Sequence, residues 1–507
     1  MFSMNARSFY ATLAVAAALL LSSCDILGDV EPKQSVEAET ALKTKLDYEA
    51  LLTSIYDRAQ GESHYGETFM LAPGALADNI QNTPDNSNRY PGFARNNPGS
   101  HMTRYNGSYA AINETNYIIS QIGEVEFDGE PQSVNERIEG EARFMRALNY
   151  FDLVRTKAYE PGREVDGFDL GVPIRTEPTE ASDEVEALER ATNDAVYDLI
   201  ESDLTAAIDL LGENVTTPLR ANQVAAQALL ARVHLYQGAL GEEQYANAEQ
   251  YATAALENAG LVGASLVTVD TSAFETGSTN NAYYNSWTSE EVHPESLFEL
   301  DFEQTNDNAV TGFNESVTSL TLAPEQGGGW GDLYPTRALY DPSAPASDAH
   351  EDGDVRATMY QFGEKGDESF PYIQKWQPVE GAYTHNHPVM RYSLLLLIRA
   401  EARAEQGNLS GAVEDINTLR SARGLDAYDG EMSTNAIVEA VMHERRVEFA
   451  FEGYRFFDLK RRGMNIPKPQ DGGGVLQYRG GQESFLILSP LPTDEVDQFG
   501  LTQNPGY

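Results

Sequence analysis

The chain has 507 residues, of which 41% are hydrophobic and 10% aromatic, enough to form a sizeable core and to exclude a disordered, collagen-like or coiled-coil protein. It carries 35 basic residues against 79 acidic ones, a formal net charge of -44, which excludes the basic surface that nucleic-acid-binding proteins need. Only eight of the basic residues are lysine. We interpret this acid-rich, lysine-poor composition as adaptation to concentrated salt, which screens self-repulsion.

The first residues have the features of an export signal. Arg7 is the only charged residue before Cys24, and it precedes an apolar run at 11–21 that is shorter than the about 20 residues of a membrane-spanning helix. The string LSSC ends at Cys24, the only cysteine of the chain, and resembles the lipobox of bacterial lipoproteins. We therefore expect a signal peptide over 1–23, a lipidated Cys24, and an acidic tether over 24–40.

The N-terminal part of the folded region, about 41–260, has the apolar spacing of helices. The expected helices cover about 42–60, 133–156 with Ser133 as its cap, 185–211, 222–240 and 243–260. The last two form a pair around a break that contains Gly238 and Gly241. Their small residues allow the close approach found in tetratricopeptide-type hairpins.

Residues 61–108 have a different composition, dominated by glycine, proline and asparagine. The sequence predicts a long irregular segment here. Long loops in compact proteins are often functional, but a plain surface excursion is an equal alternative.

The middle of the chain, about 261–390, is poor in helix signals, and its clearest strand is predicted at 296–302. The C-terminal part, about 391–507, returns to helices. They are expected as a pair over 391–424, broken at Gly407 with Ser410 as the second cap and Gly424 at the end, and as a helical region over about 434–462. The expected fold is mainly α: an α-α superhelix of tetratricopeptide-like helix pairs, with large loop-rich insertions and a few short strands.

Several strings carry a specific resemblance. They are the lipobox, EGEARFMRALNYFDLVR at 139–155, HERRVEFAFEGYRFFDLKRRG at 443–463 and LPTDEVDQFGLTQNPGY at 491–507. In this order they closely resemble the SusD/RagB family of Bacteroidota outer-membrane lipoproteins. The resemblance spans nearly the whole chain, from 24 to 507.

The resemblance implies a SusD-like fold and a nutrient-binding role without chemistry on the ligand. It implies a lipid-anchored protein on the exterior of the outer membrane, which closes over a TonB-dependent transporter of the SusC/RagA kind. Such proteins pass a captured ligand, commonly an oligosaccharide and sometimes a peptide, to the channel. The acidity and the loops of this sequence depart from familiar members, so the choice between glycan and peptide stays open.

The charged residues of 443–463 have two interpretations. Glu444, Arg445, Arg446 and Glu448 mix opposite charges at helical spacing, which predicts ion pairs that flank a core helix. The alternative is a basic patch that docks an acidic partner surface.

Aromatic side chains in the loops are the candidates for ligand contact, because flat ring faces stack on sugars and extended peptides. The predicted ligand-binding residues are Tyr90, Tyr283, Tyr284, Trp287, Trp330 and Trp376, with Phe93 as a further wall beside Tyr90. The alternative is that these rings anchor loops in the core, which for Trp330 is at least as well supported.

Catalytic and metal-binding motifs are absent: there is no HExxH, paired CxxC, GxSxG or P-loop. His385 and His387 are expected in a solvated loop, and the acidic DGD at 352–354 lacks the ligand pattern of an EF-hand. We expect no enzyme and no cofactor, although charge alone leaves a structural calcium ion open. The alternatives are a surface-anchored glycan-degrading enzyme and a tetratricopeptide-type protein scaffold.

Overall fold

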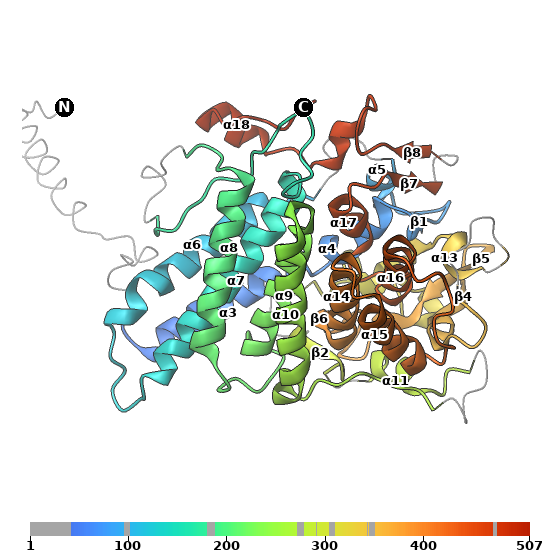
Figure 1. Ribbon diagram of the computed structural model, residues 1–507, viewed down its shortest axis with the longest axis horizontal. Helices are drawn as coiled ribbons and strands as arrows, with labels where there is room; N and C mark the ends of the chain where they lie inside the picture. The colour runs from blue at the N-terminus through green and yellow to red at the C-terminus, as the bar shows by residue number, and fades with distance from the viewer. Residues whose placement is uncertain are drawn as a thin grey trace, which may run out of the picture.

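The computed structural model describes residues 42–95, 102–179, 188–270, 278–289, 292–303, 310–341, 343, 350–469 and 474–507. The predicted signal peptide over 1–23, Cys24 and the whole predicted tether over 24–40 lie outside these residues. The described part is mainly α-helical, with short two-stranded antiparallel sheets, as predicted (Figure 1). No helix in this part is both long and apolar enough to cross a membrane.

The N-terminal helices pack one on the next in chain order (Figure 1). They are α3 (Lys45–Ala59), α6 (Tyr105–Gln121), α7 (Ser133–Lys157), α8 (Asn193–Leu211), α9 (Gln223–Tyr236) and α10 (Glu242–Asn258). The break between α9 and α10 contains Gly238 and Gly241, as predicted. A Cβ atom at Gly238 would lie 2.5 Å from the ring of Tyr245, so the close approach of this pair depends on glycine.

The C-terminal helices continue the same architecture. They are α14 (Tyr392–Glu405), α15 (Leu409–Ala422), α16 (Thr434–Glu448) and α17 (Arg455–Arg461). Helix α14 packs on α15, on α16 and also on α10. The pairs α9/α10 and α14/α15 therefore lie side by side, although the loop-rich middle separates them in the chain (Figure 1).

Two predicted helix caps are wrong by a short shift. Ser133 is the first residue of α7, and the preceding Gln132 makes no side-chain cap. Ser410 lies inside α15, because Asn408 is the cap and accepts a hydrogen bond from the backbone of Gly411 at 3.2 Å. Asparagine and serine are equally favoured at the N-cap position, so residue preference alone did not distinguish a helix capped by Asn408 from one capped by Ser410.

The segment 61–108 is more regular than predicted. It contains α4 (Thr68–Ala75), β1 (Ile80–Asn82) and α5 (Pro91–Ala94), and α6 begins within it at Tyr105. Residues 69–75 of α4 are all buried, so the helix has no polar face and no amphipathic period to detect.

In its described residues the loop-rich middle contributes three short α-helices and five strands. They are α11 (Ala282–Trp287), α12 (Val317–Thr321), α13 (Arg337–Tyr340), β2 (Ser296–Leu300), β3 (Leu333–Pro335), β4 (Tyr360–Lys365), β5 (Glu368–Ile373) and β6 (His387–Arg391). Strand β3 pairs with β1, β2 with β6, and β4 with β5. The strand predicted at 296–302 is therefore present, and every residue of β2 is buried.

The C-terminal tail holds β7 (Ile466–Lys468), β8 (Gly474–Leu476) and α18 (Thr493–Phe499). Asn504, from the terminal string QNPGY, donates to the carbonyl oxygens of Lys157 at 2.9 Å and Ser489 at 2.7 Å. Arg190 donates to the Asn504 side chain at 2.9 Å. This string therefore ties the chain terminus to the end of α7.

Candidate functional site

Three of the predicted ligand contacts are core residues. The exposed fractions of Tyr283, Trp287 and Trp376 are 1%, 0% and 0%. The two indole rings meet edge to face with centroids 5.5 Å apart, and the Lys375 ammonium lies 4.9 Å from the Trp287 ring. A ligand cannot reach a ring that has no exposed surface, so these residues anchor the loops, as in the alternative interpretation.

Of the two other predicted tyrosines, Tyr284 is partly exposed and Tyr90 is buried. Tyr284 is half-buried on α11 and packs against the core. Tyr90 is 6% exposed, and its hydroxyl donates to the Glu67 carboxyl at 2.7 Å. Its ring contacts Phe93 with centroids 4.9 Å apart, so the predicted pair exists and Phe93 is its more accessible member.

Trp330 is the predicted tryptophan that stays at the surface. The Phe313 ring lies 5.2 Å from the Trp330 ring and 5.4 Å from the Tyr383 ring, centroid to centroid. Phe313 is 43% exposed, and Trp330 and Tyr383 are half-buried. We call Phe313, Trp330 and Tyr383 the aromatic cluster. Phe313 and Tyr383 were not predicted, because each is a single aromatic residue in an aperiodic loop.

The glycine triplet before Trp330 explains why this ring reaches the surface. A Cβ atom on Gly328 would lie 2.0 Å from the carbonyl oxygen of Leu322, and one on Gly329 would lie 2.0 Å from Ser319 Oγ. Glycine therefore lets the backbone approach α12, where the Trp330 amide donates to the Ser319 carbonyl at 2.9 Å.

Arg89 connects the aromatic cluster to the early loop. Its guanidinium lies 5.4 Å from the Trp330 ring centroid and 3.8 Å from Asp332 Oδ2. The Asp332 side chain is fully buried and also pairs with Lys365 and Ser87. One buried carboxylate thus fixes groups from the early loop and from the β4–β5 hairpin against the cluster.

A cavity of about 390 Å³ adjoins the cluster through Arg89. Its lining residues are Glu62, Glu67, Thr68, Asn88, Arg89, Tyr90, Pro91, Gly92, Phe93 and Thr103. Burial raises the pKa of Glu67 to about 8. A second cavity, of about 400 Å³, shares Asn88 and Pro91 and is lined mostly by polar side chains, including Asn82, Thr83 and Asn86.

This arrangement suits the recognition of a hydroxyl-rich ligand. The aromatic cluster offers apolar ring surface, and the two cavities offer amide, hydroxyl and carboxyl groups that can bond to hydroxyls. The long early segment and the loop-rich middle both contribute to this surface, as expected of loops on a rigid scaffold.

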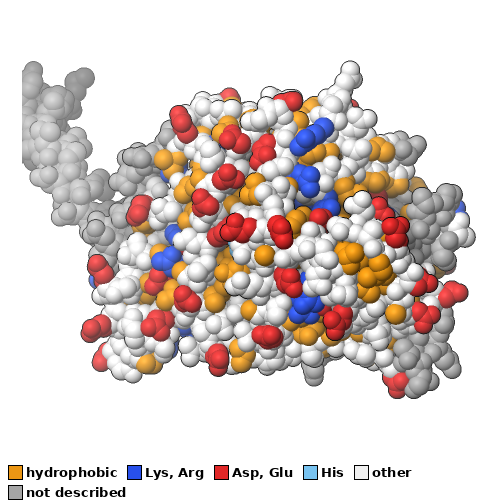
Figure 2. All heavy atoms as spheres, in the orientation of Figure 1, with side chains coloured by type: hydrophobic (Ala, Val, Ile, Leu, Met, Phe, Trp, Pro, Cys, Tyr) orange, Lys and Arg blue, Asp and Glu red, His pale blue; other side chains and the backbone are white. Residues whose placement is uncertain are grey.

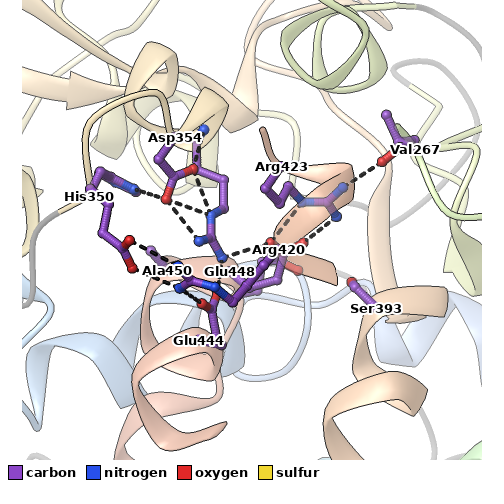
Figure 3. Close-up of polar contacts among 12 residues, drawn as sticks. Val267, His350, Asp354, Ser393, Arg420, Arg423, Glu444, Glu448 and Ala450 are labelled. Atoms are coloured by element: carbon purple, nitrogen blue, oxygen red, sulfur yellow. Dashed lines mark hydrogen bonds and ion pairs between the residues drawn. The ribbon is translucent and has the colours of Figure 1, made fainter. Parts of the chain in front are cut away.

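The charged residues of 443–463 form the predicted structural ion pairs. Figure 3 shows Glu444 and Glu448 among guanidinium groups from other elements. The six basic residues of 444–462 all have acidic partners: Arg445 with Asp458, Arg446 and Arg455 with Asp78, Lys460 with Glu160, Arg461 with Glu401, and Arg462 with Glu405. These pairs account for the charges without an acidic partner surface.

The prediction of a solvated loop for His385 and His387 is wrong. Both are buried, with exposed fractions of 6% and 3%, and burial lowers their pKa values. His387 Nδ1 bonds to the Tyr65 carbonyl at 2.7 Å, and His385 Nε2 to the Trp287 carbonyl at 3.0 Å. In the described part of the chain, no group of three His, Cys, Asp or Glu residues is placed to hold a metal ion.

Comparisons with known proteins agree with this fold. A family model described as starch-binding and associating with the outer membrane matches residues 29–235, and a SusD family model matches residues 346–507. SusD-like protein P2 of Formosa agariphila is 25% identical over 530 residues, which cover 96% of this chain and 98% of that protein.

Solved structures share the architecture. A SusD superfamily protein from Bacteroides thetaiotaomicron has a TM-score of 0.75 at 25% identity, with 91% of this chain and 100% of that one covered. A SusD-like carbohydrate binding protein from Bacteroides vulgatus has a TM-score of 0.71 at 19% identity, with 90% and 96% covered. By both family models and by its fold, the chain belongs to the SusD/RagB family.

Proposed function

We propose that this protein is a lipid-anchored lipoprotein on the exterior of the outer membrane, which captures an oligosaccharide and delivers it to a TonB-dependent transporter of the SusC/RagA kind. The single observation that carries the binding role is the aromatic cluster beside a cavity of about 390 Å³. The ligand lies across Phe313, Trp330 and Tyr383, and one sugar residue enters the cavity.

The family context supports an oligosaccharide over a peptide. One matching model is described as starch-binding, and a structural relative is described as carbohydrate binding. Rings that are only partly exposed, next to amide and carboxyl groups, favour the alternating apolar and hydroxyl faces of a sugar. Capture leaves the glycan intact, and the transporter moves it across the membrane.

Trp330→Ala is expected to weaken oligosaccharide binding by at least about tenfold, because the largest stacking surface of the cluster is removed. The mature chain, purified in detergent, would be titrated calorimetrically with a panel of neutral oligosaccharides, and each bound sugar would be analysed chromatographically. Phe362→Ala is the matched control, since Phe362 is 66% exposed and contacts Tyr340 rather than the cluster.

The outcomes of this titration separate the candidate functions. Tight binding of an unchanged sugar, lost in Trp330→Ala but kept in Phe362→Ala, supports capture at the cluster. Conversion of a bound sugar would instead support a degradative enzyme. Equal binding by both variants would place the ligand elsewhere, and no binding of any sugar would favour the scaffold.

Cys24→Ala is expected to release the protein from membranes, because this change removes the proposed site of lipid attachment. Fractionation of cells that express each form would measure the distribution, with a Ser23→Ala variant as the control for changes beside the cleavage point. Retention of Cys24→Ala in the membrane fraction would contradict the lipid anchor.

A further inference from the structure

The second cavity, of about 400 Å³, has a single charged residue in its wall. That residue is Arg95, and the other lining residues are asparagine, threonine, proline and alanine. Asp85 is the only carboxylate between 82 and 95, and it is exposed to solvent and does not line the cavity. Within the described part of the chain, Arg95 forms no ion pair. Its guanidinium is therefore available to a ligand, in a chain with 79 acidic residues against 35 basic ones.

The loop that presents Arg95 is held in one conformation. The Asn82 side chain donates across the loop to the carbonyl oxygen of Arg89 at 2.7 Å. Asn88 and Tyr90 adopt positive φ angles of 65° and 60°, a conformation that costs free energy for residues other than glycine. Such positions persist only where the surrounding contacts fix them, so the wall of the cavity is preformed.

Arg89 brings a second guanidinium close to this cavity. It lines the first cavity, and the two cavities share Asn88 and Pro91. Arg89 lies 3.8 Å from Asp332, which pairs more closely with Lys365. Because Lys365 already compensates the Asp332 carboxylate, the positive charge of Arg89 is only partly balanced.

The acidic residues that line the first cavity balance little of this charge. Glu62 is exposed, so water screens its carboxylate. Burial raises the pKa of Glu67 to about 8, so its carboxyl group is mostly protonated at neutral pH. An anionic group that enters the second cavity therefore meets guanidinium groups and no buried carboxylate in the cavity wall.

We propose that the second cavity holds a carboxylate or sulfate group of the ligand against Arg95, so that the protein captures acidic oligosaccharides in preference to neutral ones. This inference rests on the proposed binding role of the aromatic cluster. The sugar rings lie on the cluster, and the ligand continues past Arg89, which contacts Trp330, into the second cavity. A guanidinium binds carboxylate and sulfate groups through two parallel hydrogen bonds, which add geometric selectivity to the attraction of opposite charges.

Matched ligands would test the preference for acidic groups. The probes are six-residue α-1,4-, β-1,3- and β-1,4-glucans, each compared with a counterpart oxidised to carboxylates at C6, a counterpart sulfated at O6, and the methyl ester of the oxidised form, which lacks its charge. The mature chain would be titrated calorimetrically in 0.5 M NaCl, where a Debye length of roughly 4 Å limits long-range repulsion by the acidic protein. At least one anionic form is expected to bind at least tenfold more tightly than both neutral forms of the same glucan. Equal or weaker binding of both anionic forms would overturn the proposal.

Variants would assign the preference to Arg95. Arg95→Gln is expected to reduce the ratio of anionic to neutral affinity at least fivefold and to leave the affinity for the neutral glucan unchanged. Arg95→Lys keeps the charge but loses the paired hydrogen bonds, so it should retain part of the ratio. A ratio that does not change in Arg95→Gln would contradict the assignment to this cavity.

Lys45→Gln is the matched control for net charge. It also removes one exposed positive charge, but at the start of α3, about 20 Å from the end of this helix that leads to Glu62. This variant should leave the ratio of affinities unchanged. An equal reduction by Lys45→Gln and Arg95→Gln would contradict a local cause.

The titrations distinguish failure of the preference from failure of the binding role. If no form of any glucan binds, the proposed binding role fails for these sugars and the preference for acidic groups fails with it. If neutral and anionic forms bind equally and Trp330→Ala removes the binding of both, the binding role holds and only the preference is overturned.

Discussion

Replacing Glu448 by glutamine is expected to lower the free energy of unfolding by about 3–5 kcal/mol, the loss typical of breaking a buried ion pair from one side. Glu448 is fully buried near the end of α16. Its carboxylate bonds to Arg391 at 2.6 Å and to Arg423 at 2.7 Å, and it approaches Arg356 at 3.4 Å. These guanidinium groups hold its pKa well below the usual range.

The loss in stability is large because the guanidinium groups of Arg391 and Arg423 stay buried in the variant, while the carboxylate charge that compensated their burial is removed. Arg391 and Arg423 are buried, and their remaining shared carboxylate is Glu295, at 2.9 and 2.8 Å. Glutamine fills the same volume but supplies one neutral oxygen in place of a charge. Its amide group would also point donors toward guanidinium donors.

Glu130→Gln is the matched control, since Glu130 pairs with Lys45 at 2.8 Å across an exposed surface, and such pairs contribute about 0–1 kcal/mol. Urea unfolding followed by circular dichroism would measure both variants against the parent protein. A loss in Glu448→Gln no larger than that in Glu130→Gln would show that the buried network contributes little to stability.

The sequence predicted the long helices because their apolar residues recur with a helical period. Helices α10 and α15 show such a stripe; on α10 the buried residues Tyr245, Ala248, Ala252 and Ala255 lie beside exposed polar positions. The short helix α4 is buried on all sides, and α6 was also not predicted. In the eight-residue α4 complete burial removes the period and the segment is short, whereas the longer α9, also buried over nearly all its length, was still predicted.

The candidate site was less predictable, because exposure depends on neighbours that are distant in the chain. The sequence favoured a core position more for Trp330 than for Trp287, although both lie in polar, glycine- or asparagine-rich strings. Lys375 and Arg391 cover the Trp287 ring, whereas the Trp330 ring meets Phe313 and Arg89 at the surface. These contacts arise only when separate loops meet on the helical scaffold.

We expect the stability of the protein to depend on salt because of its excess of acidic residues, 79 against 35 basic ones. Many of the basic residues form ion pairs inside the fold. Buried examples are Arg356, Arg391, Arg423, Arg445 and Arg461. The solvent-facing surface is therefore left with a large acidic excess, and Figure 2 shows acidic side chains spread over one face with basic ones in only a few places. Unscreened repulsion among these carboxylates opposes folding.

Lowering NaCl from 1 M to 0.05 M is expected to reduce the melting temperature by roughly 5–10 °C, since the Debye length grows severalfold over this range and exposed charges act at longer distance. Calorimetric scans in NaCl and in choline chloride would measure the melting temperature. Equal curves in the two salts would indicate screening, which depends on ionic strength and not on the identity of the ion.

Variants would test whether exposed carboxylates cause the effect. Exchange of the exposed residues Glu213, Glu243, Glu257 and Glu431 for glutamine should make the melting temperature depend less on salt. Glu448→Gln should melt lower but keep the parent slope, because its partners are buried beyond the reach of salt. A melting temperature that does not change with salt would contradict the halophilic interpretation of the composition.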